Sequence, residues 1–91
     1  MAFVMRFSGM GMSAEKYDAI MSRLNAAGAG SPTGRLAHVC FGDKANLHVS
    51  DIWSSMEEFE AFGSTLMPIL HEFGIDPGQP EVIPVHNFVK G

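Results

Sequence analysis

The side chains best suited to chemistry are one acid and two histidines in the second half of the chain. Asp51 lies on the otherwise apolar face of a predicted strand, residues 47–53. A carboxylate in that position needs a partner or a raised pKa, which makes Asp51 a candidate general base. His71 and His86 are the alternative bases, because imidazole exchanges protons near neutral pH.

Five further residues are candidates for holding a substrate. Trp53 offers a flat wall on which a ring could stack, with Tyr17 and Phe62 from the predicted helices beside it. Asn87 and Arg6 are candidates for stabilising an anion or a carbonyl of the ligand.

Several of these residues also have a plainer structural interpretation. Asp51 stands near a strand end, where it could stay partly solvated and brace the next turn. Trp53 could be ordinary core, and His71, on a helix, could point to solvent. These alternatives stay open at the level of the sequence.

Three other site classes are not expected from the sequence. The four histidines lack ligand-like spacing, and no H-x-x-x-H or C-x-x-C motif occurs, so no metal site is expected. Residues 9–14 match the G-x-G-x-x-A dinucleotide fingerprint, but the chain is too short for a doubly wound sheet. We therefore interpret Gly9 and Gly11 as a tight turn. Cys40 has no activating neighbour in the sequence and is expected to be a buried, inert thiol.

Length and composition favour one small domain, residues 1–91, that associates with itself. The chain is 46% hydrophobic and 18% charged, more apolar material than a small monomer readily buries. A net charge of −4 with scattered basic residues argues against nucleic-acid binding. No run reaches membrane-spanning length, the start becomes polar too soon for a signal peptide, and the lone cysteine suits the cytoplasm.

The capping and alternation signals predict six elements in the order β-α-β-β-α-β. Ser13 is expected to cap the first helix, and Ser54 the second in a capping box with Glu57. Pro68 predicts a kink or a second short helix starting near Met67. The predicted strands are residues 2–8, 35–41, 47–53 and 81–89, the helices run from 13 to about 27 and from 54 to a stop at 74, and turns occupy 9–12 and 42–45.

This order predicts an α+β fold, a ferredoxin-like antiparallel sheet with both helices on one face. Strand order 4-1-3-2 would place the last strand, with Pro80 and Pro84, at an edge where missing N–H donors cost little. The other sheet face would be bare, so we expect a homodimer that pairs two such faces into a dimeric α/β barrel.

Strand alternation also predicts which side chains share the bare face. The residues expected to face the helices are Phe3, Met5, Phe7, Ala37, Val39, Phe41, Leu47, Val49, Ile83 and Val85. The opposite face would carry Arg6, Ser8, His38, Cys40, His48, Ser50 and His86 among Val4, Leu36, Ile52, Val82, Pro84 and Phe88. That mixture suits either a polar-lined cavity or a wet dimer interface whose histidines have partners.

One stretch resembles a known superfamily. Residues 51–55, Asp-Ile-Trp-Ser-Ser, followed by Glu58-Phe59 and Phe62, resemble the W-x-S-x-x-x-F pattern of the dimeric α/β-barrel superfamily, which includes antibiotic-biosynthesis-monooxygenase-like proteins. Leu66, Pro68 and residues 84–87, Pro-Val-His-Asn, resemble a poorly characterised bacterial subgroup. The resemblance spans nearly the whole chain.

The resemblance implies sheets paired back to back and a ligand held between the sheet and the helices of each subunit. Haem-degrading members pair a first-strand Asn with a Trp and a His near the second helix. Here the first strand offers Arg6 and Phe7, the Trp position holds Phe62, and only His71 lies near the His position. The resemblance therefore implies no haem, and we expect no cofactor.

Two functional hypotheses follow. The first is a protein that binds a small apolar or aromatic molecule and acts as a cofactor-independent monooxygenase-like enzyme, in which the substrate supplies electrons to oxygen. The second is a non-catalytic homodimeric accessory or ligand-sensing domain. A cavity below about 300 Å³ would disfavour the first hypothesis.

Overall fold

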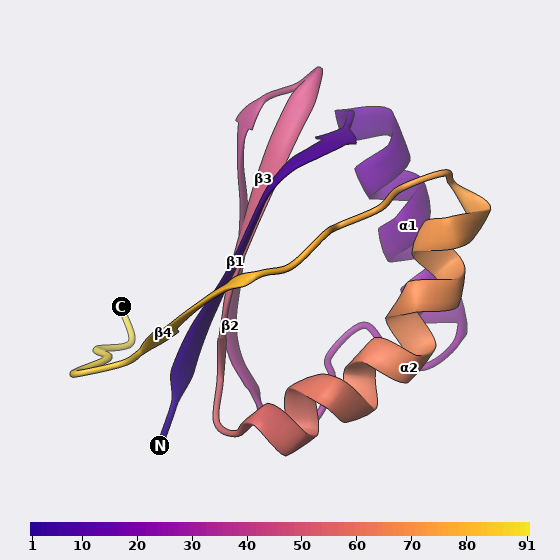
Figure 1. Ribbon diagram of the computed structural model, residues 1–91. Helices are drawn as coiled ribbons and strands as arrows, with labels where there is room; N and C mark the ends of the chain where they lie inside the picture. The colour runs from indigo at the N-terminus through magenta and orange to yellow at the C-terminus, as the bar shows by residue number, and fades with distance from the viewer.

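The computed structural model describes all 91 residues and has the predicted β-α-β-β-α-β order, an α+β ferredoxin-like fold. Four antiparallel strands form one sheet, and both helices pack on the same face of it (Figure 1). The elements are β1 (Phe3–Met12), α1 (Ala14–Ala26), β2 (Arg35–Asp43), β3 (Asn46–Trp53), α2 (Met56–Glu72) and β4 (Glu81–Pro84).

The strand order is β2-β3-β1-β4, which confirms the predicted arrangement with the proline-bearing strand at an edge. β4 is shorter than expected, because it ends at Pro84 and not at Val89. The reason is the register: Pro84 lies opposite Phe3, the first residue of β1, so only the Val85 N–H finds a further acceptor, on Ala2. The remaining tail extends away from the helices (Figure 1).

The helix caps explain where each helix begins. Ser13 caps α1 as predicted, accepting from the N–H of Lys16. The cap of α2 is Ser55, one residue later than expected, and its partner is Glu58 instead of Glu57. The shift arises because the Ser54 N–H donates to the Gly34 carbonyl at 2.8 Å, which holds Ser54 against the loop before β2. Hydrogen bonds from Ser54 and Ser55 lower the pKa of the Glu58 carboxyl.

Pro68 does not start a second helix. α2 continues from Met56 to Glu72 with Pro68 inside it, and Figure 1 shows the ribbon changing direction partway along. The buried side chains Ile69 and Leu70 follow the proline directly. The packing of this last turn against the core can offset the lost hydrogen bond.

The Gly-Met-Gly-Met segment is part of β1 and not the turn that the sequence predicted. Phe7 pairs with Val49, but Met12 pairs with Leu47, so β1 bulges by three residues at this point. Gly9 and Gly11 take left-handed backbone angles, with φ of 68° and 67°. The methionines between and after them, Met10 and Met12, point into the core.

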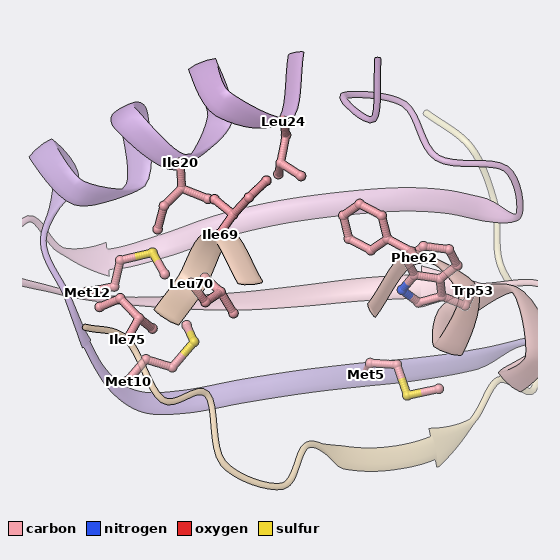
Figure 2. Packing of buried hydrophobic residues seen from close by; sticks show 10 residues of the cluster. All are labelled: Met5, Met10, Met12, Ile20, Leu24, Trp53, Phe62, Ile69, Leu70 and Ile75. Atoms are coloured by element: carbon pink, nitrogen blue, oxygen red, sulfur yellow. The ribbon is translucent and has the colours of Figure 1, made fainter. Parts of the chain in front are cut away.

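The core lies between the sheet and the two helices. Figure 2 shows Trp53 and Phe62 together at one end and the methionines of the bulge, with Ile75, at the other. Trp53 and Met5 are fully buried. Only 12 of the 91 residues are buried, so this single layer of packing leaves much apolar surface open elsewhere.

The prediction of which side chains of β2 and β4 face the helices was wrong, because the parity of both strands is reversed. His38 pairs with Asp51 and Cys40 with Val49, so these two side chains face the helices while Val39 and Phe41 face outward. On β4, Val82 pairs with Met5 and Ile83 with Val4, which also reverses the expected parity. The outer face that results carries the exposed apolar side chains Val39, Phe41 and Ile83.

Two glycine substitutions, one in the bulge and one inside α2, should change the free energy of unfolding in opposite directions. Gly11→Ala puts a side chain on a left-handed backbone and should lower the free energy of unfolding by about 1–2 kcal/mol. Gly63→Ala, inside α2 with nothing within 4 Å of the new Cβ, should raise it by about 0.5–1 kcal/mol. Urea unfolding of both variants checks this, and equal effects would contradict the role of the bulge.

Candidate active site

A cavity of about 650 Å³ lies between the sheet and the helices. Its lining of 24 residues, 13 of them hydrophobic, comes from both helices, from β1, β2 and β3, and from the loop before β4. The lining is Phe7, Met10, Met12, Tyr17, Ile20, Met21, Leu24, Arg35, His38, Val49, Asp51, Phe59, Glu60, Phe62, Gly63, Ser64, Leu66, Met67, Pro68, Leu70, Pro77, Gly78, Gln79 and Pro80. The volume and character suit a small, largely apolar ligand.

Three polar side chains form a hydrogen-bonded chain in one wall of the cavity. The Nδ1 atom of His38 lies 2.5 Å from Oδ1 of Asp51, and its Nε2 atom lies 2.7 Å from the Tyr17 hydroxyl. The planes of the Tyr17 and His38 rings are nearly parallel, with an interplanar angle of 3° and ring centroids 6.0 Å apart. Asp51 is 6% exposed, so His38 is the partner that its buried carboxylate requires.

With Asp51 ionised and His38 neutral, the donors and acceptors of this chain follow from the chemistry of the three groups. An ionised Asp51 carboxylate only accepts, so the proton between it and His38 belongs to Nδ1. A neutral His38 then accepts at Nε2, which leaves the Tyr17 hydroxyl as donor. The result is an Asp-oriented imidazole whose basic nitrogen points at a phenol that lines the cavity.

The β2–β3 hairpin brings His38 and Asp51 together. Asp43 pairs with Asn46, so only Lys44 and Ala45 form the loop, and the same register sets His38 opposite Asp51. Tyr17 reaches the pair from the first turns of α1, whose start is fixed by the Ser13 cap. The Ala14 N–H also donates to the Lys44 carbonyl at 2.7 Å, which ties this helix start to the hairpin loop.

Burial and neighbouring charge perturb two groups in this wall. Burial raises the pKa of the Tyr17 phenol, and the charges of Cys40 and Asp51 raise it further, while Arg35 acts in the opposite direction. Burial, together with the charge of Asp18, raises the pKa of the Cys40 thiol. The raised pKa keeps Cys40 in its weakly nucleophilic form.

Three of the predicted site residues meet in the cavity. Asp51, Tyr17 and Phe62 line it, and Asp51 and Tyr17 belong to the same hydrogen-bonded chain. Trp53 is fully buried behind it and packs against Phe59 and Phe62, with ring centroids 5.6 and 5.4 Å away. The Trp53 indole Nε1 has no hydrogen-bond partner.

The other four predicted site residues lie outside the cavity lining. Arg6 is exposed, and its pairing with Ser50 places it on the bare sheet face. His71 is exposed in the last turn of α2. His86 and Asn87 are exposed in the tail after β4.

His38 is the residue that the sequence interpretation placed on the wrong face. The apolar alternation of Ala37, Val39 and Phe41 assigned these residues to the helix face and His38 to the outer face, whereas the pairing of His38 with Asp51 gives the opposite parity. The signal that could have found it is the hairpin itself. A two-residue loop after Asp43 already places His38 opposite Asp51.

No group of three or more His, Cys, Asp or Glu side chains in this chain is arranged to hold a metal ion. None of the helices has both the length and the apolar character needed to span a membrane.

The fold has relatives among solved structures. SnoaB, a cofactor-independent oxygenase from Streptomyces nogalater, superposes with a TM-score of 0.61 at 17% identity, over 99% of this chain and 96% of that chain. A Chloroflexus aurantiacus protein attributed to the antibiotic biosynthesis monooxygenases gives 0.58 at 18% identity, over 99% and 97%. One from Bacteroides thetaiotaomicron, attributed likewise, gives 0.54 at 14% identity, over 100% and 91%.

Comparison of the sequence with known families and with curated proteins finds no match. The structural superpositions nevertheless show that the chain has the ferredoxin-like fold of antibiotic-biosynthesis-monooxygenase-like proteins, as the sequence pattern predicted. At these identities the likeness shows the fold and leaves the chemistry to be argued from the side chains.

Tyr17 is the only tyrosine, so its titration can be followed directly by tyrosinate absorbance. In the folded protein it should ionise above pH 10, and in urea near its ordinary value of about 10. Because the folded-state pKa is the higher one, the stabilisation is present below about pH 10 and is lost as pH rises through the folded value. Cys40→Ala should move the folded midpoint toward the unfolded one, and a wild-type midpoint at or below the unfolded one would contradict the assignment.

Proposed function

We propose that the protein binds a small, largely apolar ring compound in this cavity and oxidises it with dioxygen, as a cofactor-independent monooxygenase-like enzyme. The observation that carries the proposal is the hydrogen-bonded chain of Tyr17, His38 and Asp51 in the wall of a cavity of about 650 Å³. A base beside an apolar cavity is what such a reaction needs from the protein.

His38 is the proposed base, with Asp51 as its positioning residue. The substrate loses a proton to the Tyr17 oxygen while the phenol passes its own proton to Nε2 of His38, 2.7 Å away. Transfer in one step avoids a free phenolate, which the raised pKa of Tyr17 disfavours. Asp51 holds the imidazole in the required tautomer and stabilises the imidazolium that forms.

The oxidation then needs only the substrate and dioxygen. The deprotonated carbon gives an electron to O₂, and the two radicals recombine as a carbon-bound peroxide anion. The proton returns from His38, and loss of water leaves a carbonyl where a CH₂ group stood. One oxygen atom enters the product and the other leaves as water, so a CH₂ group and O₂ become C=O and H₂O.

His38→Gln should lower kcat for oxygen uptake by about 10²–10⁴, since it removes the base but keeps a side chain of similar size. The assay is an oxygen electrode with a panel of hydroquinones and enolisable polycyclic ketones and no added cofactor. His71→Gln is the matched control, because His71 is exposed on α2 and should leave turnover unchanged.

Comparing oxygen uptake by the two variants shows which of the two histidines is the base. Loss of turnover in His71→Gln with retention in His38→Gln would remove His38 from the mechanism and restore the alternative base. Far-ultraviolet circular dichroism of both variants shows whether the fold is intact.

A non-catalytic accessory or ligand-sensing domain is the second candidate. The observation in its favour is that the Tyr17 hydroxyl already occupies the basic nitrogen of His38, as a purely structural network would. Native mass spectrometry showing a bound ligand, together with no oxygen uptake across the panel, would support this candidate over the first.

We also propose that the protein is a homodimer through the outer face of the sheet. That face carries the exposed apolar side chains Val39, Phe41 and Ile83, and no helix of the chain covers it (Figure 1). The buried atoms His48 Nδ1 and Ser50 Oγ, on outward-facing positions of β3, have no partner within the chain. A second copy would supply a face of the same character by two-fold symmetry.

Val39→Glu should convert this dimer to a monomer, because it places a charge on the proposed interface at a side chain that is 51% exposed in the single chain. Val89→Glu, in the tail and 73% exposed, makes the same chemical change away from that face and should leave the dimer intact. Native mass spectrometry reads the subunit number, and a monomeric wild-type protein would refute the proposed dimer.

A further inference from the structure

One cation lines the cavity, and it is the Arg35 guanidinium at the start of β2. The lining contains no lysine and no second arginine. Arg35 and His38 also border a smaller hollow of about 300 Å³ beside Ser31 and Pro32.

The Arg35 side chain is held in place but its charge is not neutralised. Its one hydrogen bond runs from a terminal nitrogen to the carbonyl oxygen of Gly30, at 3.0 Å. The guanidinium carbon lies 5.8 Å from the centre of the Phe62 ring, over its face. The ion pairs of the chain are Arg23 with Glu72 and His38 with Asp51, so Arg35 has no carboxylate partner.

We propose that Arg35 is the specificity-determining residue of the cavity, and that its ligand is an apolar ring compound with one anionic oxygen, a carboxylate or an ionised phenol or enol, bound at the Arg35 end. The inference rests on the proposed function and names the substrate class of the same site. A guanidinium has five N–H donors, and four of them are free to bind such an oxygen.

The two acids of the lining do not cancel this preference. The Asp51 carboxylate is buried and accepts from His38, so its charge is already compensated by a hydrogen bond. Glu60 is exposed on α2, where water screens its charge. Arg35, by contrast, is half-buried and holds its charge against the cavity.

Arg35 also lines the same cavity as Tyr17 and His38, where the proposed reaction would form an anion. Its charge opposes the rise in the pKa of Tyr17 that burial and the nearby acids cause, so the two groups are near enough to interact. A ligand oxygen that becomes negative when Tyr17 and His38 take up a proton would face the same guanidinium.

Three probes of one size and different charge test the proposal: naphthoate, naphthamide and naphthylmethylammonium, titrated calorimetrically at pH 7. The wild-type protein should bind naphthoate about tenfold or more tightly than naphthamide, since hydrogen bonds to a charged group are the stronger ones. Arg35→Met should remove this preference and leave the affinity for naphthamide within about twofold, because the apolar part of the site is kept.

Two further variants serve as controls. Arg23→Met makes the same change at an arginine on α1 that pairs with Glu72 outside the cavity, and should alter neither affinity. Arg35→Lys keeps the charge and should retain most of the naphthoate preference.

The outcomes separate this inference from the proposed function. Equal binding of naphthoate and naphthamide, or a preference that survives in Arg35→Met, overturns the role of Arg35 while the apolar ligand site stands. Tightest binding of the ammonium probe also overturns it and assigns recognition to the acids. Binding of none of the three probes removes both this inference and the proposed ring-binding function.

Discussion

The interaction on which the site depends is the contact between the buried Asp51 carboxylate and His38. A charge that is only 6% exposed is costly without a partner, and the chain provides one at 2.5 Å. That partner is available only because the β2–β3 hairpin turns over two residues and sets the two side chains opposite each other on one face. A slip of one residue would turn His38 to the outer face and leave the carboxylate unpaired. The register of this hairpin therefore decides whether the cavity wall contains the His38–Asp51 pair.

The irregular part of β1 supplies one portion of the cavity lining, Met10 and Met12. A regular strand would have continued its pairing with β3 past Phe7, but the bulge adds three residues and turns Met10 and Met12 toward the helices. Methionine is flexible and polarisable, so these side chains can bound an opening without filling it completely. The small number of buried residues is consistent with a layer of packing that is kept open at its centre. The same thin core makes the bare outer face more important, since a partner subunit is the proposed source of further burial.

The likeness to SnoaB and to other oxygenase-type structures concerns the backbone. With 17% identity to SnoaB, the shared feature is a four-stranded sheet with two helices on one face, which can carry many kinds of chemistry. The groups suited to chemistry belong to this chain: the hydrogen-bonded Tyr17, His38 and Asp51, the unneutralised Arg35, and the apolar walls around them.

The sequence by itself determined the order of the elements, the strand order, the placement of β4 at an edge and the candidacy of Asp51. Those properties follow from local signals: alternation, caps, prolines, and a polar residue on an apolar face. Only the tertiary structure decided which histidine meets Asp51, that Ser55 and not Ser54 caps α2, and that Trp53 lies behind the cavity wall. The physical reason is the same in each case. The pairing of His38 with Asp51, a bulge at Gly9 to Gly11, and one hydrogen bond from Ser54 to Gly34 each depend on contacts with a distant segment, which local periodicity does not record.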